Sequence, residues 1–205
     1  MSGRRINDFY PTPAWGTERL LARCLIDGVV LEPCAGDGRI ANVLKNSSAR
    51  KVYTNDIDAK YGCCGAIDAL HPHLWDAGFW SSLVGQLPDW VISNPPFSIA
   101  DRLVPLAFQH AQSGVAMLLR ISWLEPTKAR AEFLAAHPPT MLIVLPRISF
   151  TGDGKSDNVT CAWFVWDKQH QGNLCQQVHQ EIIIEPHRAP QPALAGPRRE
   201  HPRRR

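Results

Sequence analysis

The sequence lacks the features of several protein classes. No apolar run approaches the roughly 18 residues that a membrane helix needs, and even the run from Met141 to Leu145 is short. No apolar segment follows Arg4 and Arg5, so we expect no secretory signal and a cytoplasmic protein. The six Cys residues show no CxxC spacing, which predicts reduced thiols and no metal site.

Phosphate-binding loops are also missing. The segment from Glu32 to Gly38 contains two glycines but not the GxGxxG form, and no GK[ST] tripeptide follows it. Dinucleotide and ATP binding are therefore disfavoured. The 205 residues are 44% hydrophobic and 20% charged, which is typical of one packed domain, with or without a tail.

The net positive charge is confined to one end of the chain. The formal charge of the whole chain is +3, but residues 186–205 hold six Arg and one acidic residue, a net +5. The other 185 residues carry 16 basic and 18 acidic side chains, a net −2. The tail also has five Pro and no apolar periodicity, so we expect a folded domain over 1–185 and a disordered tail over 186–205.

Apolar segments alternate between strand-like and helix-like patterns. Helices are expected to begin at Thr12-Pro13, with Thr12 as N-cap, and at Ser98, where Ser98 and Asp101 form a capping-box pattern. We expect the first of these helices to end at Asp27-Gly28. Strands are expected at residues 29–31, 51–56, 66–68, 90–93, 115–119, 141–145 and 162–166.

This order predicts a Rossmann-like α/β fold with a doubly wound, mostly parallel, seven-stranded sheet. The last two strands are joined by a loop, residues 147–160, that has no helical pattern. A connection without a helix favours an antiparallel pairing, so we expect an antiparallel strand at that edge of the sheet.

The first chemical motif is Glu32-Pro33-x-x-Gly36-x-Gly38, which lies between an expected strand and an expected helix. Glycines at such a turn let a ligand approach the main chain. Asp56 follows Gly38 by 18 residues at the end of the next strand, where an acid commonly binds two ribose hydroxyls. Taken alone, the glycine motif could be a purely structural turn, and Asp56 could be a solvated acid. The two together, at the ends of successive strands, favour a nucleoside-bearing cofactor.

The second motif is Asn94-Pro95-Pro96-Phe97 at the end of another strand. The prolines make a stiff turn at the edge of the sheet where open α/β sheets bind ligands. An exocyclic amine could donate to the Asn94 side-chain carbonyl and the Pro95 backbone carbonyl while its ring stacks on Phe97. A rigid loop that only caps the strand would explain the prolines but not Asn94 and Phe97.

On these motifs the chain resembles the S-adenosylmethionine-dependent amino-methyltransferases, and most of all the compact phage and prophage DNA N6-adenine methyltransferases. The resemblance runs from Tyr10-Pro11-Thr12-Pro13, through both motifs, to the 162–166 strand. It implies S-adenosylmethionine as cofactor, methyl transfer to adenine N6 in DNA, and the cytoplasm of a bacterium or phage-infected host. It implies no metal and no membrane association.

The resemblance also assigns roles to residues. Glu32 and the glycines would surround the methionine part of the cofactor, Asp56 would bind its ribose, and Ile57 and Asp68 would contact its adenine. The cofactor-binding set is Thr12, Pro13, Glu32, Pro33, Ala35, Gly36, Gly38, Asp56, Ile57, Asp68 and Asn94. The catalytic set, Asn94, Pro95, Pro96 and Phe97, would hold a base that has left the duplex.

DNA contacts are less well indicated by the sequence. Larger family members carry a separate target-recognition domain, whereas only about 20 residues separate Trp166 from the tail here. The loop 147–160 could read a groove or could be a solvated hairpin loop, and the sequence leaves both open. The candidate nucleic-acid-binding residues are Arg120, Lys128, Arg130, Arg147, Lys155 and Asn158.

Other substrates and a non-enzymatic role stay open at this point. Cytosine N4 in DNA, adenine in RNA and glutamine in proteins also present an amine to such a tetrad. A non-catalytic nucleic-acid-binding protein on the same fold is the remaining alternative, and the intact glycines, acids and tetrad speak against it.

The charge distribution gives a first testable prediction. Removal of residues 186–205 is expected to weaken DNA binding and to flatten its salt dependence without unfolding the domain, because the tail carries a net +5. Binding of a duplex at several salt concentrations measures the slope. An unchanged slope in the truncated protein would show that the tail takes no part in binding.

Overall fold

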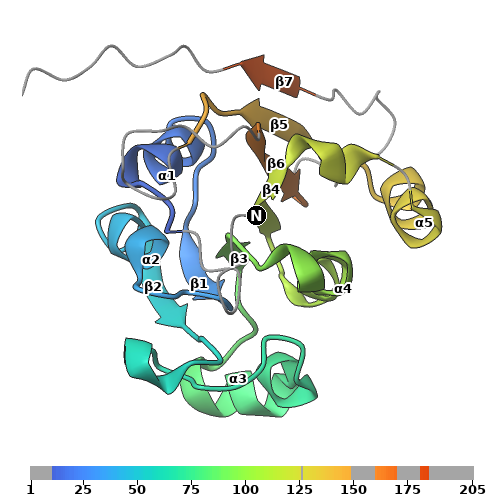
Figure 1. Ribbon diagram of the computed structural model, residues 1–205. Coiled ribbons are helices and arrows are strands. Elements are labelled where there is room, and N and C mark those ends of the chain that lie inside the picture. The colour runs from blue at the N-terminus through green and yellow to red at the C-terminus, as the bar shows by residue number, and fades with distance from the viewer. Residues whose placement is uncertain (1–10, 126, 149–159, 170–180, 185–205) are drawn as a thin grey trace, which may run out of the picture.

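The fold is an α/β sandwich built on one sheet. A computed structural model describes residues 11–125, 127–148 and 160–169, and the backbone of 181–184. The sheet has the strand order β2-β1-β3-β4-β6-β5-β7 (Figure 1). The strands are β1 Gly28–Glu32, β2 Ala49–Thr54, β3 Trp90–Ser93, β4 Gly114–Arg120, β5 Met141–Val144, β6 Cys161–Asp167 and β7 Glu181–Ile184.

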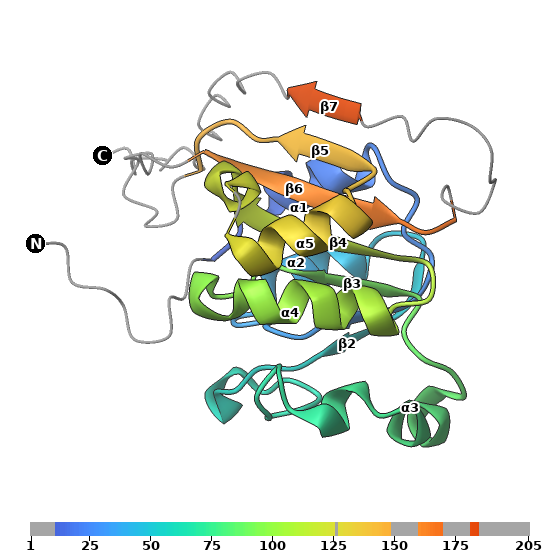
Figure 2. The ribbon, with the colours of Figure 1, turned by 90° about the vertical axis from the view of Figure 1, so that its right-hand side faces the viewer.

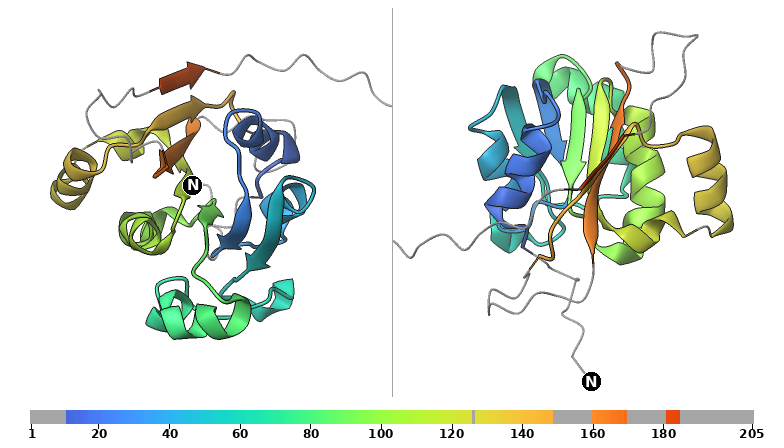
Figure 3. Two further views of the ribbon diagram at one scale, coloured as in Figure 1. Left: turned by 180° about the vertical axis from the view of Figure 1, so that it is seen from behind. Right: turned by 90° about the horizontal axis from the view of Figure 1, so that it is seen from above.

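Helices cover both faces of this sheet. α1 and α2 lie on one face and α4 and α5 on the other, as Figures 2 and 3 show. The α-helices are α1 Ala14–Leu21, α2 Arg39–Leu44, α3 Ala77–Val84, α4 Phe97–His110 and α5 Lys128–Ala136. Three short 3-10 helices complete the described elements, η2 Ala59–Tyr61, η3 Pro72–Trp75 and η4 Ile121–Leu124.

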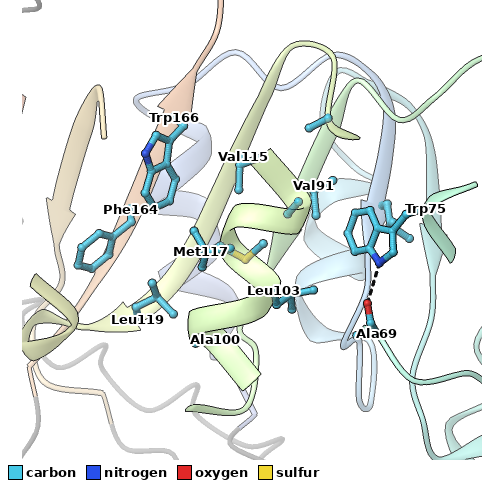
Figure 4. Close-up of a cluster of buried hydrophobic side chains, with 14 of the residues drawn as sticks. Ala69, Trp75, Val91, Ala100, Leu103, Val115, Met117, Leu119, Phe164 and Trp166 are labelled. Carbon is cyan, nitrogen blue, oxygen red and sulfur yellow. Dashed lines mark hydrogen bonds between the residues drawn. The ribbon is translucent and has the colours of Figure 1, made fainter. Parts of the chain in front are cut away.

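Alternating side chains on the strands build two cores, one on each face. Val29, Val91, Val115 and Phe164 belong to the same cluster as buried residues of α3 and α4, and Figure 4 shows part of this cluster. Their neighbours in sequence, such as Val30 and Ile92, pack against α1 and α2 instead. Both faces of the central strands are therefore apolar, which explains why these strands read as continuous hydrophobic runs in the sequence.

Buried tryptophans connect the helices and loops to the sheet. The Trp163 Nε1–H of β6 donates to the Gly16 carbonyl of α1 at 2.8 Å. The Trp166 Nε1–H donates to the His137 carbonyl beyond α5 at 2.9 Å. A buried indole N–H needs such a partner, so the first bond holds α1 on the sheet and the second holds the end of α5 there.

The predicted fold class is confirmed, with corrections to single elements. The antiparallel strand predicted for this side of the sheet is β6, which pairs antiparallel with both β4 and β5 and lies between them. Six of the seven predicted strands are present. The one expected at 66–68 is wrong, and β7, which pairs parallel with β5, was not predicted.

A side chain explains the missing strand. The Ile67 N–H donates to Asn55 Oδ1, and the Ile67 carbonyl accepts from Asn55 Nδ2. Both backbone groups that would join a ladder are thus satisfied by one amide side chain. Only an isolated bridge between Asn55 and Gly65 remains.

Both predicted helix caps are also wrong. α1 begins at Ala14, and Thr12 makes no capping bond, because its hydroxyl accepts from Asn94 Nδ2. α4 begins at Phe97, and Asp101 accepts from Trp123 Nε1 instead of capping the helix. α1 also ends at Leu21, before the expected stop at Asp27-Gly28, since the chain then turns to bury Cys24 and Ile26.

Among the described residues, no helix is both long enough and apolar enough to cross a membrane. The predicted tail, residues 186–205, and most of the loop 147–160 lie outside the described residues.

The tight packing at the start of β4 yields a stability prediction. A Cβ on Gly114 would lie 2.5 Å from the Trp90 ring and 2.8 Å from the Trp166 carbonyl oxygen. Gly114→Ala is therefore expected to lower the free energy of unfolding by about 1–3 kcal/mol, measured by urea denaturation. Gly16→Ala is the control, since a Cβ there meets its nearest neighbour at 3.6 Å, an ordinary contact. Equal stability of the two variants would contradict the overpacking argument.

Candidate functional site

A cavity of about 230 Å³ opens at the carboxyl ends of β1, β2 and β3. These three strands are parallel neighbours, so the loops that follow them meet at one edge of the sheet. The residues around the cavity come from these loops, from the segment before α1 and from the start of α4. They are Pro11, Thr12, Glu32, Pro33, Cys34, Ala35, Gly36, Asp37, Arg39, Ile40, Asp56, Ile57, Asp58, Lys60, Tyr61, Asp68, Ala69, Asn94, Pro96, Ser98 and Ile99.

The structure brings most of the predicted site residues to this cavity. Of the predicted sets, those that line it are Thr12, Glu32, Pro33, Ala35, Gly36, Asp56, Ile57, Asp68, Asn94 and Pro96. The other four lie next to it in the chain: Pro13 precedes α1, Gly38 precedes α2, Pro95 is buried and Phe97 begins α4. Gly38 has φ 79°, a left-handed backbone that favours glycine, so its role is to turn the chain into α2.

Glu32 is a buried carboxylate at the base of the cavity. Its side chain is 1% exposed, and its Oε2 has no hydrogen-bond partner. Burial, and the nearby charges of Asp37 and Asp56, raise the pKa of Glu32 well above its usual range, against a backbone hydrogen bond from Ala41. A buried acceptor without a donor costs free energy, and a bound cation or N–H donor would relieve that cost.

Asp56 joins two loops of the cavity. Its Oδ2 accepts from the Gly36 N–H at 2.8 Å, and its Oδ1 accepts from the Asp58 N–H at 2.9 Å. These bonds fix the carboxylate between the turn after β1 and the segment after β2. Each carboxylate oxygen can accept a second bond, so the group can still receive two hydroxyl donors from a ligand.

Asn55, which was not among the predicted site residues, joins the segments that carry the acids of the site. It is 1% exposed, and its Nδ2 donates to the carbonyls of Pro33 and Ile67 at 3.0 and 2.9 Å. A Cβ on Gly65 would lie 2.7 Å from Asn55 Oδ1, so the 65–68 segment approaches this amide closely. The available signal was a polar residue at the end of an apolar strand, directly before Asp56.

The cavity is acidic. Five acidic side chains line it, from Glu32, Asp37, Asp56, Asp58 and Asp68, against two bases, which gives a formal charge of −3, or −2 when Glu32 holds its proton. Both bases pair with acids of the same cavity: Arg39 Nε lies 2.9 Å from Asp37 Oδ2, and Lys60 pairs with Asp58. Such a cavity favours a ligand that carries positive charge and disfavours polyphosphates.

The cavity also contains a thiol, that of Cys34, and an apolar side chain, that of Ile57. Burial and the charges of Asp56 and Glu32 raise the pKa of the Cys34 thiol far above its usual range, which disfavours the nucleophilic thiolate. Ile57 is 61% exposed beside the cavity and offers an apolar surface there. No cluster of three or more potential metal ligands occurs in the part of the chain that the structure describes.

The Asn94 tetrad adjoins the cavity at the end of β3. Asn94 Nδ2 donates to Thr12 Oγ1 at 3.1 Å, which orients the amide and ties the segment before α1 to the tetrad. Pro95 is buried, and Pro96 has the extended backbone that precedes α4. The tetrad is thus held by packing on one side and by Thr12 on the other.

The predicted DNA-binding residues differ in how they are placed. Arg120, at the end of β4, places its Cζ 4.0 Å from the centroid of the Phe97 ring. Arg130 instead pairs with Asp101 at 3.2 Å and donates to the Trp123 carbonyl at 3.0 Å, so its guanidinium serves the fold. Lys128 and Arg147 are exposed, whereas Lys155 and Asn158 lie outside the described residues.

Comparisons with known proteins identify the fold. No protein-family profile matches the sequence, and no curated protein sequence matches it either. Solved structures do match. The fold is that of S-adenosylmethionine-dependent methyltransferases.

Three of these structures illustrate the likeness. A putative class I S-adenosylmethionine-dependent methyltransferase from Listeria monocytogenes matches 83% of this chain and 61% of its own, with a TM-score of 0.54 and 12% identity. A type I restriction-modification methyltransferase subunit from Streptococcus thermophilus matches 77% of this chain and 44% of its own, with a TM-score of 0.52 and 13% identity. A putative RNA methyltransferase from Pyrococcus horikoshii matches 78% and 88%, with a TM-score of 0.54 and 19% identity.

The likeness is one of fold. The chain spans only 44% to 61% of the length of the first two structures, so it matches a part of each. At these identities the shared architecture locates the site edge but assigns no substrate.

The burial of Glu32 yields a pH-dependent stability prediction. Because its pKa is raised in the folded state, the folded protein holds this proton over a range in which the unfolded chain has lost it. Stability should therefore fall as pH rises above the unfolded pKa of about 4.3. Glu32→Gln removes this titration, and the free energy of unfolding of the variant should decline less between pH 5 and pH 8.

Urea denaturation at several pH values measures this difference. Glu132→Gln, at an exposed position of α5, is the matched control and should follow the wild-type pH profile. Parallel profiles for wild type and Glu32→Gln would show that Glu32 is ionised in the empty protein.

Proposed function

We propose that this protein transfers a methyl group from S-adenosylmethionine to the exocyclic amine of a nucleobase, with adenine N6 in DNA as the substrate. One juxtaposition carries the proposal. The Asn94 tetrad adjoins the same cavity as Glu32, Asp56 and Asp68, so an amine held by the tetrad would face a ligand held by the acids.

The cofactor fits the chemistry of the cavity. S-adenosylmethionine carries a sulfonium and an ammonium group, and the acids of the cavity outnumber its bases whether or not Glu32 is protonated. The orphaned Glu32 Oε2 supplies an acceptor for the ammonium group, and Asp56 supplies acceptors for the ribose hydroxyls. Ile57 would pack on the adenine, whose amine would donate to Asp68. When bound, the cofactor supplies an electrophilic methyl group.

The residues of the tetrad would bind the amine of the substrate and make its lone pair available for attack. Asn94 Oδ1 and the Pro95 carbonyl would accept its two N–H bonds, which draws the nitrogen toward tetrahedral geometry and exposes its lone pair. The attacking amine is neutral, so no general base is needed beforehand, and its proton can leave after the transfer. Holding the nitrogen in line is then the main contribution of the protein to the rate.

A base within a duplex cannot reach this edge of the sheet, so the target base would be flipped out. Phe97 offers it a stacking surface. Arg120, Lys128 and Arg147 supply positive charge near this edge, while Lys155, Asn158 and the basic tail are further candidates for contacts with phosphate. Two of the structural neighbours are described as restriction-modification subunits, which supports DNA, and one as a putative RNA methyltransferase, which keeps RNA as an outcome of the test.

Asn94→Ala tests the proposal. The variant is expected to lose methyl transfer by at least about 100-fold, because the amine loses an acceptor that acts in the transition state. The affinity for S-adenosylmethionine should change by less than about threefold, since the acids that would hold the cofactor are unchanged. Calorimetry measures the affinity, and labelled cofactor with mixed nucleic acids and protein measures the transfer.

Mass spectrometry of the digested products then decides the substrate. N6-methyladenine from DNA supports the proposal. N4-methylcytosine, N6-methyladenine from RNA only, or methylglutamine replaces the substrate but keeps the chemistry. Wild-type activity of Asn94→Ala would remove the tetrad from the mechanism, and absence of cofactor binding would leave a non-catalytic binding protein.

A further inference from the structure

The arginine beside the tetrad has an unusual environment. Arg120 ends β4, whose neighbour β3 runs parallel and leads into the tetrad. Its backbone is fixed, because Arg120 pairs with Cys161 of β6 and the following Ile121 N–H donates to the Thr160 carbonyl. Any change in the position of the guanidinium must therefore come from side-chain rotation.

The guanidinium lies where a planar group would stack. Its Cζ is 4.0 Å from the Phe97 ring centroid, a distance at which a guanidinium interacts with an aromatic face. The Arg120 Nε is buried and has no hydrogen-bond partner. A stack accompanied by an unpaired buried donor is less favourable than one in which every donor is paired.

Arg130 shows what a structural arginine looks like in the same region. Its guanidinium donates to the carbonyl of Trp123 and pairs with Asp101, and its side chain is 17% exposed. By contrast, Arg120 contacts α4 through the ring of Phe97, and this stack leaves its buried Nε donor unpaired. This unpaired donor points to a ligand.

We infer that Arg120 is a substrate-positioning residue whose guanidinium covers the stacking face of Phe97 until a nucleobase replaces it. On replacement, the side chain turns outward and its N–H donors bind a backbone phosphate of the same nucleic-acid strand. This inference rests on the proposed function and narrows it. A planar base can compensate for the lost cation–π contact by stacking on Phe97, whereas the amide side chain of a protein cannot do so equally well.

Two probes separate the two halves of this exchange. Adenosine has a base but no phosphate, and a short single-stranded oligonucleotide rich in adenine has both. Each is titrated into the full-length protein in the presence of S-adenosylhomocysteine, which keeps adenosine out of the cofactor cavity. NMR or calorimetry gives the affinity of adenosine, and fluorescence anisotropy at several salt concentrations gives that of the oligonucleotide.

The substitution Arg120→Met should move the two affinities in opposite directions. Adenosine should bind about threefold more tightly, because no guanidinium has to be displaced from Phe97. The oligonucleotide should bind about 5- to 10-fold more weakly, with a salt slope reduced by about 1, because one phosphate contact is lost. Arg120→Lys keeps the charge but not the planar stack, so it should improve adenosine binding and keep oligonucleotide affinity near wild type.

Arg50→Met removes the same charge from the opposite edge of the sheet, where Arg50 donates to the Gln86 side chain, and should change neither affinity. Thermal unfolding shows whether each variant is folded, and Arg120→Lys preserves the test if Arg120→Met is not. Weaker binding of both probes by Arg120→Met would overturn the inference and make Arg120 a support for Phe97. Unchanged binding of both would overturn it as well.

The result that would refute the proposed function differs from the results that would refute the role of Arg120. These titrations measure binding, and the products of wild-type methylation are identified separately. A wild type that methylates DNA while Arg120→Met weakens both probes refutes only the exchange. A wild type that binds no S-adenosylmethionine and methylates nothing refutes the proposed function, whatever Arg120 does.

Discussion

The candidate site depends on the hydrogen bonds of one buried amide. Asn55 binds the Pro33 carbonyl in the turn after β1 and both backbone groups of Ile67 in the segment after β2. Glu32 and Asp68 are the direct chain neighbours of Pro33 and Ile67, and Asp56 directly follows Asn55 itself. Three acids from distant parts of the sequence are therefore placed around one cavity by a neutral side chain that does not itself line it.

In this arrangement, the groups that position the acidic segments are not themselves charged. Acids crowded at one edge repel one another, and burial makes their ionised forms costly. Neutral hydrogen bonds supply the geometry, so the acids need not pair with buried bases to be held in place. The cavity can then keep a negative potential that favours a cationic ligand over a neutral one, although residues 1–185 as a whole, cavity included, carry only −2.

The sheet could be predicted from local sequence, and so could the candidate site at the carboxyl ends of its strands, because both predictions rest on patterns of residues that are close together in the chain. Apolar runs such as Trp90 to Ser93 and the turn glycines at 36 and 38 carry their structural signal in themselves. The errors occurred where a distant partner decided the outcome. Thr12 was expected to cap α1 but binds Asn94, Asp101 binds Trp123, and the 66–68 segment binds Asn55 in place of a strand. In each case a polar group could form either a local hydrogen bond or one to a residue distant in the sequence. The sequence alone does not distinguish the two, and the folded chain forms the distant one.

The reversed direction of β6 determines at which edge of the sheet the chain passes from β5 to β6. Since β5 runs parallel to the central strands and β6 runs against them, the connection between the two leaves and re-enters the sheet at the edge that bears the tetrad. Ile148 and Thr160, the described residues on either side of that connection, are held by core packing and by a bond to Ile121, respectively. Insertions or replacements between these two anchor points would begin and end at the edge of the sheet that bears the tetrad, so the chain could gain residues at that edge while β5 and β6 keep their register.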